Sequence, residues 1–390
     1  MLKCPLSKKT LAVTATLLTA VLAVAACGTS TNTEPVSDKA VSSDTAIASL
    51  PADAQLAISL RVHDTLADPQ VRDLIGTLGT SRSGKRATGV LDTATKDLGI
   101  DPTDIDRTVV FTSRLSGLSV HDEGHSALGS LGYSANALVV GRVNFDQAKI
   151  VASLNASDYG PLQQATAYRG VSISQSGDGD FGIAFLAPNL MVLGKPDGIH
   201  DVIDVRTRAK PALSGDLADR LSGDSLLRLV ATVPSRAFGK AFQGATPVGS
   251  SANPLGGALG SLVDASAFTG IKTVSANVDK AGAEFLYQAT IAYDDAQTAQ
   301  RGQALFSGLV NLYRGFTGSA LGGLLNKVKV VANGSDVVVT ARYNTADLNQ
   351  VTGAVKALSA LSGLRQGAPG MPMTPPKPAG PPPSVAPPKR

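Results

Sequence analysis

The chain has 390 residues, with 35 Lys and Arg against 31 Asp and Glu, no Trp and only 4% aromatic residues. Three of the basic residues precede position 10 and three follow position 376, so the region between is close to neutral. A near-neutral body argues against a nucleic-acid surface or an anionic-lipid surface. The scarcity of aromatic rings likewise argues against base-stacking platforms and sugar-binding shelves.

The N-terminus has the pattern of an export signal. A basic start precedes the uncharged run "TLAVTATLLTAVLAVAA", which ends at Ala26, and Cys27 follows. A run of this length lies near the lower limit for spanning a bilayer. Residues 24–27, "VAAC", resemble the lipobox of bacterial lipoprotein precursors. The resemblance implies that the signal peptide, residues 1–26, is removed by cleavage between Ala26 and Cys27 and that Cys27 receives fatty acyl chains such as palmitate; the alternative is an uncleaved single-span anchor.

Acylation of Cys27 would hold the mature protein at a membrane. One acyl chain anchors a protein only marginally, so stable anchoring needs two or more chains. We therefore expect a lipid bilayer as one partner and a location in the cell envelope, outside the cytoplasm and on the periplasmic side. Gly28 favours the outer membrane if the cell has one. Cys4 leaves with the signal, so the mature chain has no free thiol and no cysteine nucleophile or cysteine metal site.

Two tethers are predicted to flank the folded part. Residues 27–45 are rich in Ser and Thr without an apolar period and are expected to form a lipidated, flexible tether. Residues 363–390 concentrate proline, which favours extended polyproline II over packed structure. We interpret this tail as disordered, with a spacer or a docking strand for another envelope component as the alternative.

The first predicted domain spans residues 46–211. A half-buried strand is expected over residues 55–62, where apolar residues alternate, and Asp68 is expected to cap the helix that follows. The next loop, "GTSRSGKR" at residues 79–86, is one residue away from a phosphate-binding loop. Because a helix precedes this loop and Arg86 replaces the magnesium-ligating hydroxyl, we predict no nucleotide binding.

The rest of the first domain is expected to contain strands and two helices. Asn144 and Gln147 are expected to form a capping box for one helix, and Asp197 to open the other. Strands are predicted over residues 107–113, 137–143, 167–175, 181–187 and 190–194.

A loop at residues 114–135 contains His121 and His125, four residues apart. Two histidines at that spacing can share a metal on a helix, and the string resembles the H-E-x-x-H of zinc peptidases. Asp122 stands where that motif has its glutamate base, and Gly124 weakens a helix. We therefore interpret residues 114–135 as a solvated loop and predict no metal site.

The second predicted domain spans residues 212–362 and repeats the element order of the first. Strands are expected over residues 226–233, 271–279 and 283–293, followed by a helix. The hairpin at residues 328–342 is predicted to turn on Asn333-Gly334, and Thr345 to cap a last helix.

These patterns predict an α+β protein of two tandem, similar domains. Each is expected to be a largely antiparallel sheet with helices on one face, because short turns join strands of alternating polarity. The stretches "SLPADAQLAISLRV" and "LGIDPTDI" also resemble the start of repeated α+β domains in uncharacterised exported bacterial proteins. That resemblance covers the first half and implies no activity.

We predict a non-enzymatic envelope lipoprotein that binds or scaffolds another envelope component. No catalytic residue and no cofactor is assigned, because the sequence shows no convergent catalytic set. A carrier of a hydrophobic ligand or lipid, held between sheet and helices, is the alternative. The second alternative is a metal-dependent hydrolase that uses the loop of His121 and His125.

Overall fold

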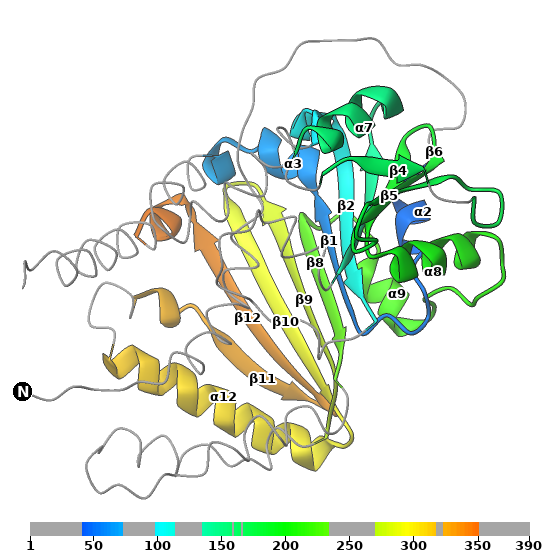
Figure 1. Ribbon diagram of the computed structural model, residues 1–390. Helices are drawn as coiled ribbons and strands as arrows, with labels where there is room; N and C mark the ends of the chain where they lie inside the picture. Colours follow the sequence, from blue (N-terminus) through cyan, green and yellow to red (C-terminus); the bar gives the residue numbers. More distant parts are fainter. Residues whose placement is uncertain are drawn as a thin grey trace, which may run out of the picture.

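The structure is a computed structural model that describes residues 41–72, 98–113, 135–157, 160–164, 167–233, 270–316 and 323–350 (Figure 1). It confirms the expected α+β class with a large antiparallel sheet. Within the described residues, one 12-stranded sheet runs in the order β11-β12-β10-β9-β8-β1-β2-β3-β7-β6-β5-β4.

The strands are β1 (Leu56–Arg61), β2 (Ile105–Thr112), β3 (Asn136–Gly141), β4 (Leu162–Gln164), β5 (Ile173–Ser176), β6 (Gly182–Ala187), β7 (Leu190–Gly194), β8 (Leu227–Thr232), β9 (Ile271–Ala281), β10 (Glu284–Tyr293), β11 (Lys329–Asn333) and β12 (Asp336–Asn344). The helices are α2 (Ser43–Ile47), α3 (Val62–Ala67), α7 (Gln147–Asn155), α8 (Pro196–Arg206), α9 (Asp216–Leu221) and α12 (Ala296–Phe316), with a short 3₁₀ turn η1 (Pro102–Asp104). The chain is also helical over residues 69–72 and 345–350.

The centre of the sheet is the pairing of β1 with β8, which we call the seam. β1 is hydrogen-bonded to β2 on one side and to β8 on the other, both antiparallel. The seam register places Leu56 opposite Ala231 and Leu60 opposite Leu227. The strands of residues 46–211 and of residues 212–350 therefore belong to one continuous sheet.

The same order of strands leads outward from the seam on both sides. One side runs β1-β2-β3-β7-β6 and the other β8-β9-β10-β12-β11. A short helix precedes each seam strand, α2 before β1 and α9 before β8, and α7 and α12 each follow the third strand of their side. The first side alone adds β4 and β5 at its outer edge.

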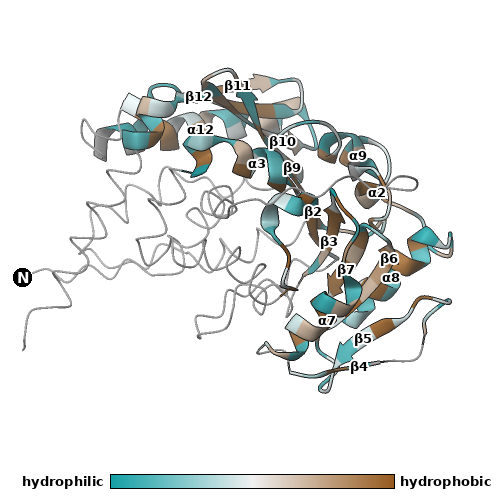
Figure 2. Ribbon diagram, turned by 90° about the horizontal axis from the view of Figure 1, so that it is seen from above, coloured by the Kyte–Doolittle hydropathy of each residue, from teal (hydrophilic) through white to brown (hydrophobic). Residues whose placement is uncertain are grey.

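Helices pack on both faces of the sheet in the first half, so the prediction of helices on one face was wrong there. Face A carries Val109, Leu138 and Val192 and packs against α2, α8 and α9. Face B carries the alternate residues of the same strands, such as Val139 and Met191, and packs against α3 and α7. The reason is that β3 and β7 are buried at every position and therefore need a cover on each side. Both strands are hydrophobic along most of their length (Figure 2).

Polar and apolar side chains alternate along the outer strands of the second half. This pattern is typical of a sheet with one face towards the solvent. Face B there carries Ile291, Tyr293 and Val337, which pack against Ala299 and the neighbouring residues of α12. Face A of β9 carries polar residues such as Ser275. No described helix packs over face A of β10 to β12.

The helix α12 is amphipathic and 21 residues long. Ala299 is fully buried, whereas Gln300 and Arg301 of the next turn are exposed. No helix in the described segments combines the length and apolarity that a bilayer crossing requires.

Local signals located most elements but misplaced two caps. Asp68 accepts hydrogen bonds from the amides of Gln70 (2.8 Å) and Val71 (3.2 Å), which confirms it as a helix cap. The cap of α7 is Asp146, which accepts from the amide of Lys149 at 3.0 Å, and not Asn144. The amide of Phe145 donates to the carbonyl oxygen of Pro188 at 2.8 Å, and the helix begins two residues later, at Gln147.

The helix at residues 345–350 is capped by Asn344 and not by Thr345. The side chain of Asn344 accepts from the amide of Asp347 at 3.0 Å, and the carboxylate of Asp347 accepts from the amide of Asn344 at 2.8 Å. This reciprocal pair satisfies two free amides at the helix start. The two-residue turn before β12 is Gly334-Ser335, since Asn333 pairs with Asp336.

A buried ion pair connects the two halves away from the seam. Lys280 of β9 donates to Asp68, whose side chain is 3% exposed. Burial alone would raise the pKa of Asp68, but the bonds from Lys280 and the two amides outweigh it and hold the pKa below 3.8. Asp68 therefore stabilises the fold in its charged form.

We expect Asp68→Asn to lower the free energy of unfolding at pH 7 by about 2 kcal/mol. The asparagine keeps the capping oxygen but leaves Lys280 unpaired, and the loss is moderated because Lys280 can turn towards water. Because the folded pKa is depressed, the contribution is present above the ordinary carboxyl pKa and disappears as the pH falls through the folded value. Urea denaturation of both proteins from pH 7 to pH 3 checks this.

The control is Asp53→Asn, which removes an exposed carboxylate and should change stability by less than about 0.5 kcal/mol. A difference between wild type and Asp68→Asn that stayed constant down to pH 3 would contradict the role of the Asp68 charge.

Candidate functional site

The residues that the sequence singled out lie mostly outside the described part of the chain. Ala26, Cys27, His121 and His125 all lie outside it, as do residues 79–86 and 351–390. Among the described residues, no group of three or more His, Cys, Asp or Glu side chains is placed to hold a metal ion.

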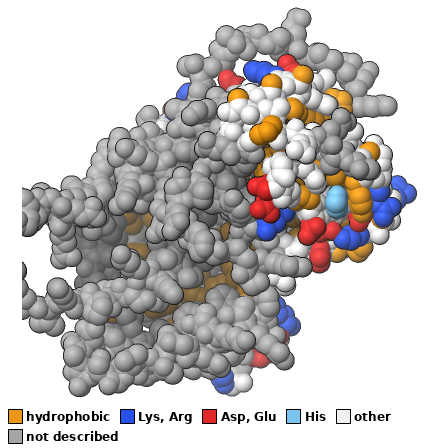
Figure 3. Space-filling view, viewed as in Figure 1, with side chains coloured by type: hydrophobic (Ala, Val, Ile, Leu, Met, Phe, Trp, Pro, Cys, Tyr) orange, Lys and Arg blue, Asp and Glu red, His pale blue; other side chains and the backbone are white. Residues whose placement is uncertain are grey.

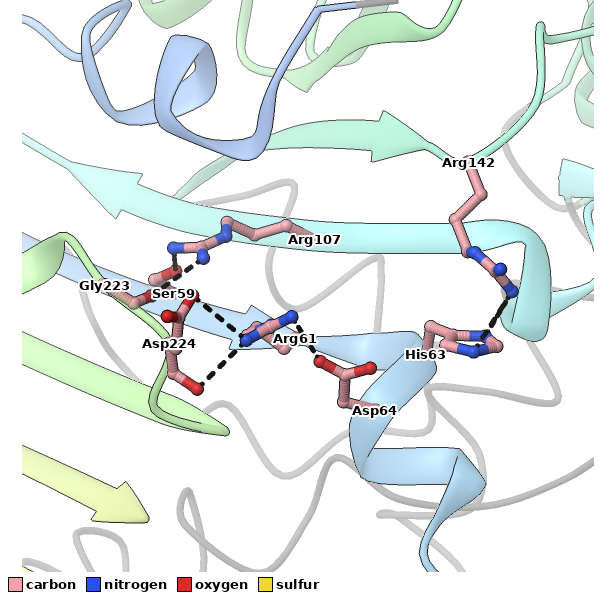
Figure 4. A network of polar contacts seen from close by, with 8 residues as sticks. All are labelled: Ser59, Arg61, His63, Asp64, Arg107, Arg142, Gly223 and Asp224. Atoms are coloured by element: carbon pink, nitrogen blue, oxygen red, sulfur yellow. Dashed lines mark hydrogen bonds and ion pairs between the residues drawn. The ribbon is translucent and has the colours of Figure 1, made fainter. Parts of the chain in front are cut away.

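The two described histidines have structural contacts. The ring nitrogen Nδ1 of His63 lies 3.0 Å from the carbonyl oxygen of Thr103. Nη1 of Arg142 lies 2.8 Å from Nδ1 and 3.1 Å from Nε2 of the same ring (Figure 4). His200 stacks on Tyr168 with ring centroids 4.1 Å apart.

Three arginines meet at one end of the seam. Arg61 ends β1, Arg107 lies opposite it on β2, and Arg228 of β8 lies opposite Ser59 of β1. Because side chains alternate along a strand, this register puts the three on face A. We call Arg61, Arg107 and Arg228 the seam arginines.

The seam arginines surround the dipeptide Gly223-Asp224, in the loop between α9 and β8. Arg107 donates to the carbonyl oxygen of Gly223 at 3.0 Å, and Arg61 donates to the carbonyl and carboxylate oxygens of Asp224 at 3.1 and 3.2 Å (Figure 4). A Cβ on Gly223 would lie 2.8 Å from Nη2 of Arg228. Gly223 also has φ +110°, a conformation that residues with side chains rarely adopt.

Arg61 and Arg107 differ in their partners at this site. Arg61 pairs with Asp64 at 2.6 Å and with Asp224, whose side chain is 97% exposed. Arg107 is 3% exposed and donates to neutral oxygens, the Ser59 hydroxyl at 3.1 Å and the Gly223 carbonyl. Burial lowers the pKa of the Arg107 guanidinium. The carboxylates of Asp44, Asp106 and Asp224 partly oppose this shift from a distance, but none of them forms an ion pair with Arg107 among the described residues.

Several buried polar atoms at the seam have no hydrogen-bond partner. They are Nε of Arg107, Nε of Arg228 and the hydroxyl of Ser225, which follows Asp224. An unpaired buried donor costs about 1–3 kcal/mol, and an incompletely paired buried charge costs more. The seam is therefore polar, and its buried hydrogen-bond donors are incompletely satisfied.

In a second polar cluster, on α8, the charged side chains are paired with one another, unlike Arg107 at the seam. Asp204 accepts from the hydroxyl of Tyr168 at 2.9 Å and from Nε of Arg169 at 2.5 Å, with Lys210 at 3.9 Å. Burial alone would raise the pKa of Asp204, but these bonds outweigh it and lower the pKa. Acidic and basic side chains are visible together over this region (Figure 3). Because the charges match, we interpret this cluster as a structural tie between α8 and the turn at Tyr168.

The seam arginines were missed by sequence reasoning, although a signal existed. Each stands inside an otherwise apolar strand, in "SLRV", "DRTV" and "LLRL". An arginine at such a position is buried only where something compensates its charge. What the sequence does not show is that the three strands are neighbours.

Comparisons with known proteins add little to this picture. No protein-family model and no curated protein matches the chain. Solved structures of TP0453 are similar at low identity: crystal form III matches with a TM-score of 0.42 and 10% identity over 79% of this chain and 97% of that one. Crystal form I gives 0.39 and 10% over 81% and 97%, and crystal form IV gives 0.40 and 9% over 79% and 95%. We draw no functional conclusion from these similarities.

We expect Gly223→Ala to lower the free energy of unfolding by about 2–3 kcal/mol, because the methyl group meets both an unfavourable φ and the Arg228 guanidinium. The matched control is Gly282→Ala in the turn between β9 and β10, where φ is +63° and nothing lies within 4 Å of the Cβ position. That change should cost only about 1 kcal/mol. Urea denaturation measures both, and equal losses would contradict close packing of Arg228 against Gly223.

Proposed function

We propose that this protein is a lipoprotein of the bacterial cell envelope, anchored through acylated Cys27, which binds or scaffolds another envelope component without performing chemistry. The observation that carries the proposal is the sequence "VAAC" at residues 24–27, directly after a basic start and an apolar run. In an envelope with two membranes, Gly28 favours the outer one.

We further propose that residues 46–211 and 212–362 are two copies of one α+β unit, joined edge to edge. The support is the order of elements: each half has a short helix, a seam strand, two more strands outward, a helix, and a hairpin that closes on the third strand. Two copies joined in this way give a wide sheet from small units.

The wide sheet suits a binding role because helices cover its two halves differently. Helices pack on both faces of the first half, whereas on face A of β9 to β12 side chains such as Thr273, Ser275 and Gln288 alternate with the apolar residues of face B. A polar face of this kind can contact a protein partner through hydrogen bonds without becoming an aggregation risk in the free state. The tether predicted over residues 27–45 ends earlier than expected, because residues 43–45 belong to α2; the part before α2 would hold this face near the membrane.

The lipid anchor is tested by metabolic labelling with a palmitate analogue. We expect the wild-type chain to be labelled and recovered with membranes, and Cys27→Ser to be unlabelled, because that sulfur accepts the acyl chain. Cys4→Ser is the matched control: it removes the other cysteine and should be labelled like the wild type. Equal labelling of Cys27→Ser and wild type would overturn the proposal.

A carrier of a hydrophobic ligand is the second candidate, and one observation favours it. Face B of the second half carries apolar and aromatic side chains, with Phe285 and Tyr287 towards the α3 end and Ile291 towards α12. Tyr287 and Tyr343 contact edge to face with centroids 5.4 Å apart, and burial raises the pKa of Tyr287 to about 12. A long apolar strip between two helical covers is a geometry that can hold an acyl chain.

Native mass spectrometry of the mature chain separates the two candidates. The scaffold proposal predicts no phospholipid uptake that depends on the apolar strip, so the wild type and Tyr287→Asp should give the same adducts or none. A stoichiometric lipid adduct that is lost in Tyr287→Asp, which places a charge on the strip, would favour the carrier instead.

A further inference from the structure

We propose that the seam arginines form a binding site for one phosphate group, either free phosphate or the phosphate of a lipid headgroup, and that the bound phosphate replaces the carboxylate of Asp224. This site does not depend on the acyl anchor, since all its residues lie in the folded part of the chain.

The first argument is that Arg107 has no charged hydrogen-bond partner. Arg61 forms ion pairs with Asp64 and Asp224. Asp44, Asp106 and Asp224 act on the charge of Arg107 from a distance, but none of these carboxylates accepts a hydrogen bond from it among the described residues. A buried cation is stabilised by a charged partner far more than by neutral oxygens. Arg107 has only neutral acceptors, so an added anion at this place would stabilise the site. A water molecule would satisfy a single donor but would not neutralise the charge.

The second argument is that Asp224 is easily displaced. Its side chain is 97% exposed and its carboxylate is 3.2 Å from Arg61. Exposed ion pairs of this kind contribute between 0 and about 1 kcal/mol, so releasing Asp224 into water costs little. The carboxylate therefore marks the position of an anion without filling the site.

The third argument is the set of available donors. Nε of Arg107, Nε of Arg228 and the hydroxyl of Ser225 are buried without a partner. Guanidinium groups recognise phosphate through paired N–H donors, and the several oxygens of a phosphate can accept from three arginines where a carboxylate has only two oxygens. A phosphate therefore suits this number of unpaired donors better than a carboxylate does.

The fourth argument concerns access. The donors are covered by the loop at residues 222–225, whose Gly223 carbonyl accepts from Arg107. Gly223 has no side chain between Arg107 and Arg228, and its φ of +110° is open to glycine alone among the common residues. Entry of the phosphate requires this loop to open, and Gly223 is the position where the backbone can change conformation at the lowest steric cost.

Isothermal titration calorimetry of the mature chain in a non-ionic detergent at low ionic strength tests the proposal. The probes are inorganic phosphate and glycerophosphoglycerol, the headgroup of phosphatidylglycerol without its acyl chains. We expect one site per chain. Tighter binding of the diester than of inorganic phosphate assigns the site to a lipid headgroup, and the reverse order assigns it to the free anion; both support a phosphate site.

Three variants make the test specific. Arg107→Met should weaken binding at least tenfold, whereas Arg342→Met removes an exposed arginine elsewhere on the sheet and should leave binding unchanged. Asp224→Asn should tighten binding about threefold to tenfold, because the competing carboxylate is gone. This last variant changes an exposed side chain, so it reports on the site even if Arg107→Met does not fold.

Three results would overturn the proposal. They are the absence of binding to either probe in the wild type, equal weakening by Arg107→Met and Arg342→Met, and unchanged or weaker binding in Asp224→Asn.

Discussion

The structure depends on one pairing, that of β1 with β8. β1 is hydrogen-bonded on both sides along its length, so neither half ends in a free strand at the seam. If the halves were separated, each would expose an apolar strand with unpaired amides and carbonyls, a known route to aggregation. The pairing therefore joins two similar series of strands into one sheet.

The seam also explains where the charged groups are found. Arg61 and Arg107 come from the first half, and Gly223, Asp224 and Arg228 from the second. The cluster thus exists only when the halves are joined. An arrangement of this kind links the integrity of the sheet to the proposed phosphate site, since an anion bound between the arginines would hold both seam strands in place. The ion pair of Asp68 and Lys280 connects the same halves on the other face.

The strands, turns and caps that the sequence predicted correctly are those determined by residues close together in the chain. Alternating and continuous apolar runs located β1, β2, β3 and β8, and the long hairpin of β9 and β10 lies where its pattern placed it. Glycine and aspartate signals located the turns, including the cap at Asp68. These features are set by local backbone preference and by side-chain period, which one stretch of sequence contains.

What the sequence did not predict depends on contacts between distant residues. The short helices α3 and α9 and the strand β4 were missed, because elements of three to six residues are stabilised by packing more than by propensity. The cap of α7 is Asp146 and not Asn144, and the residue between them, Phe145, is hydrogen-bonded through its amide to Pro188, far along the chain. The seam arginines were missed because their meeting depends on β1 pairing with β8, more than 160 residues away along the chain.

The most direct test of the seam is hydrogen–deuterium exchange of the mature chain. If β1 and β8 form the centre of one sheet, peptides covering both strands should exchange together and at the slowest rate of the molecule, while the edge strands β4 and β11 exchange faster through local opening. Fast exchange in β1 or β8, at the rate of the edge strands, would contradict the pairing on which this account rests.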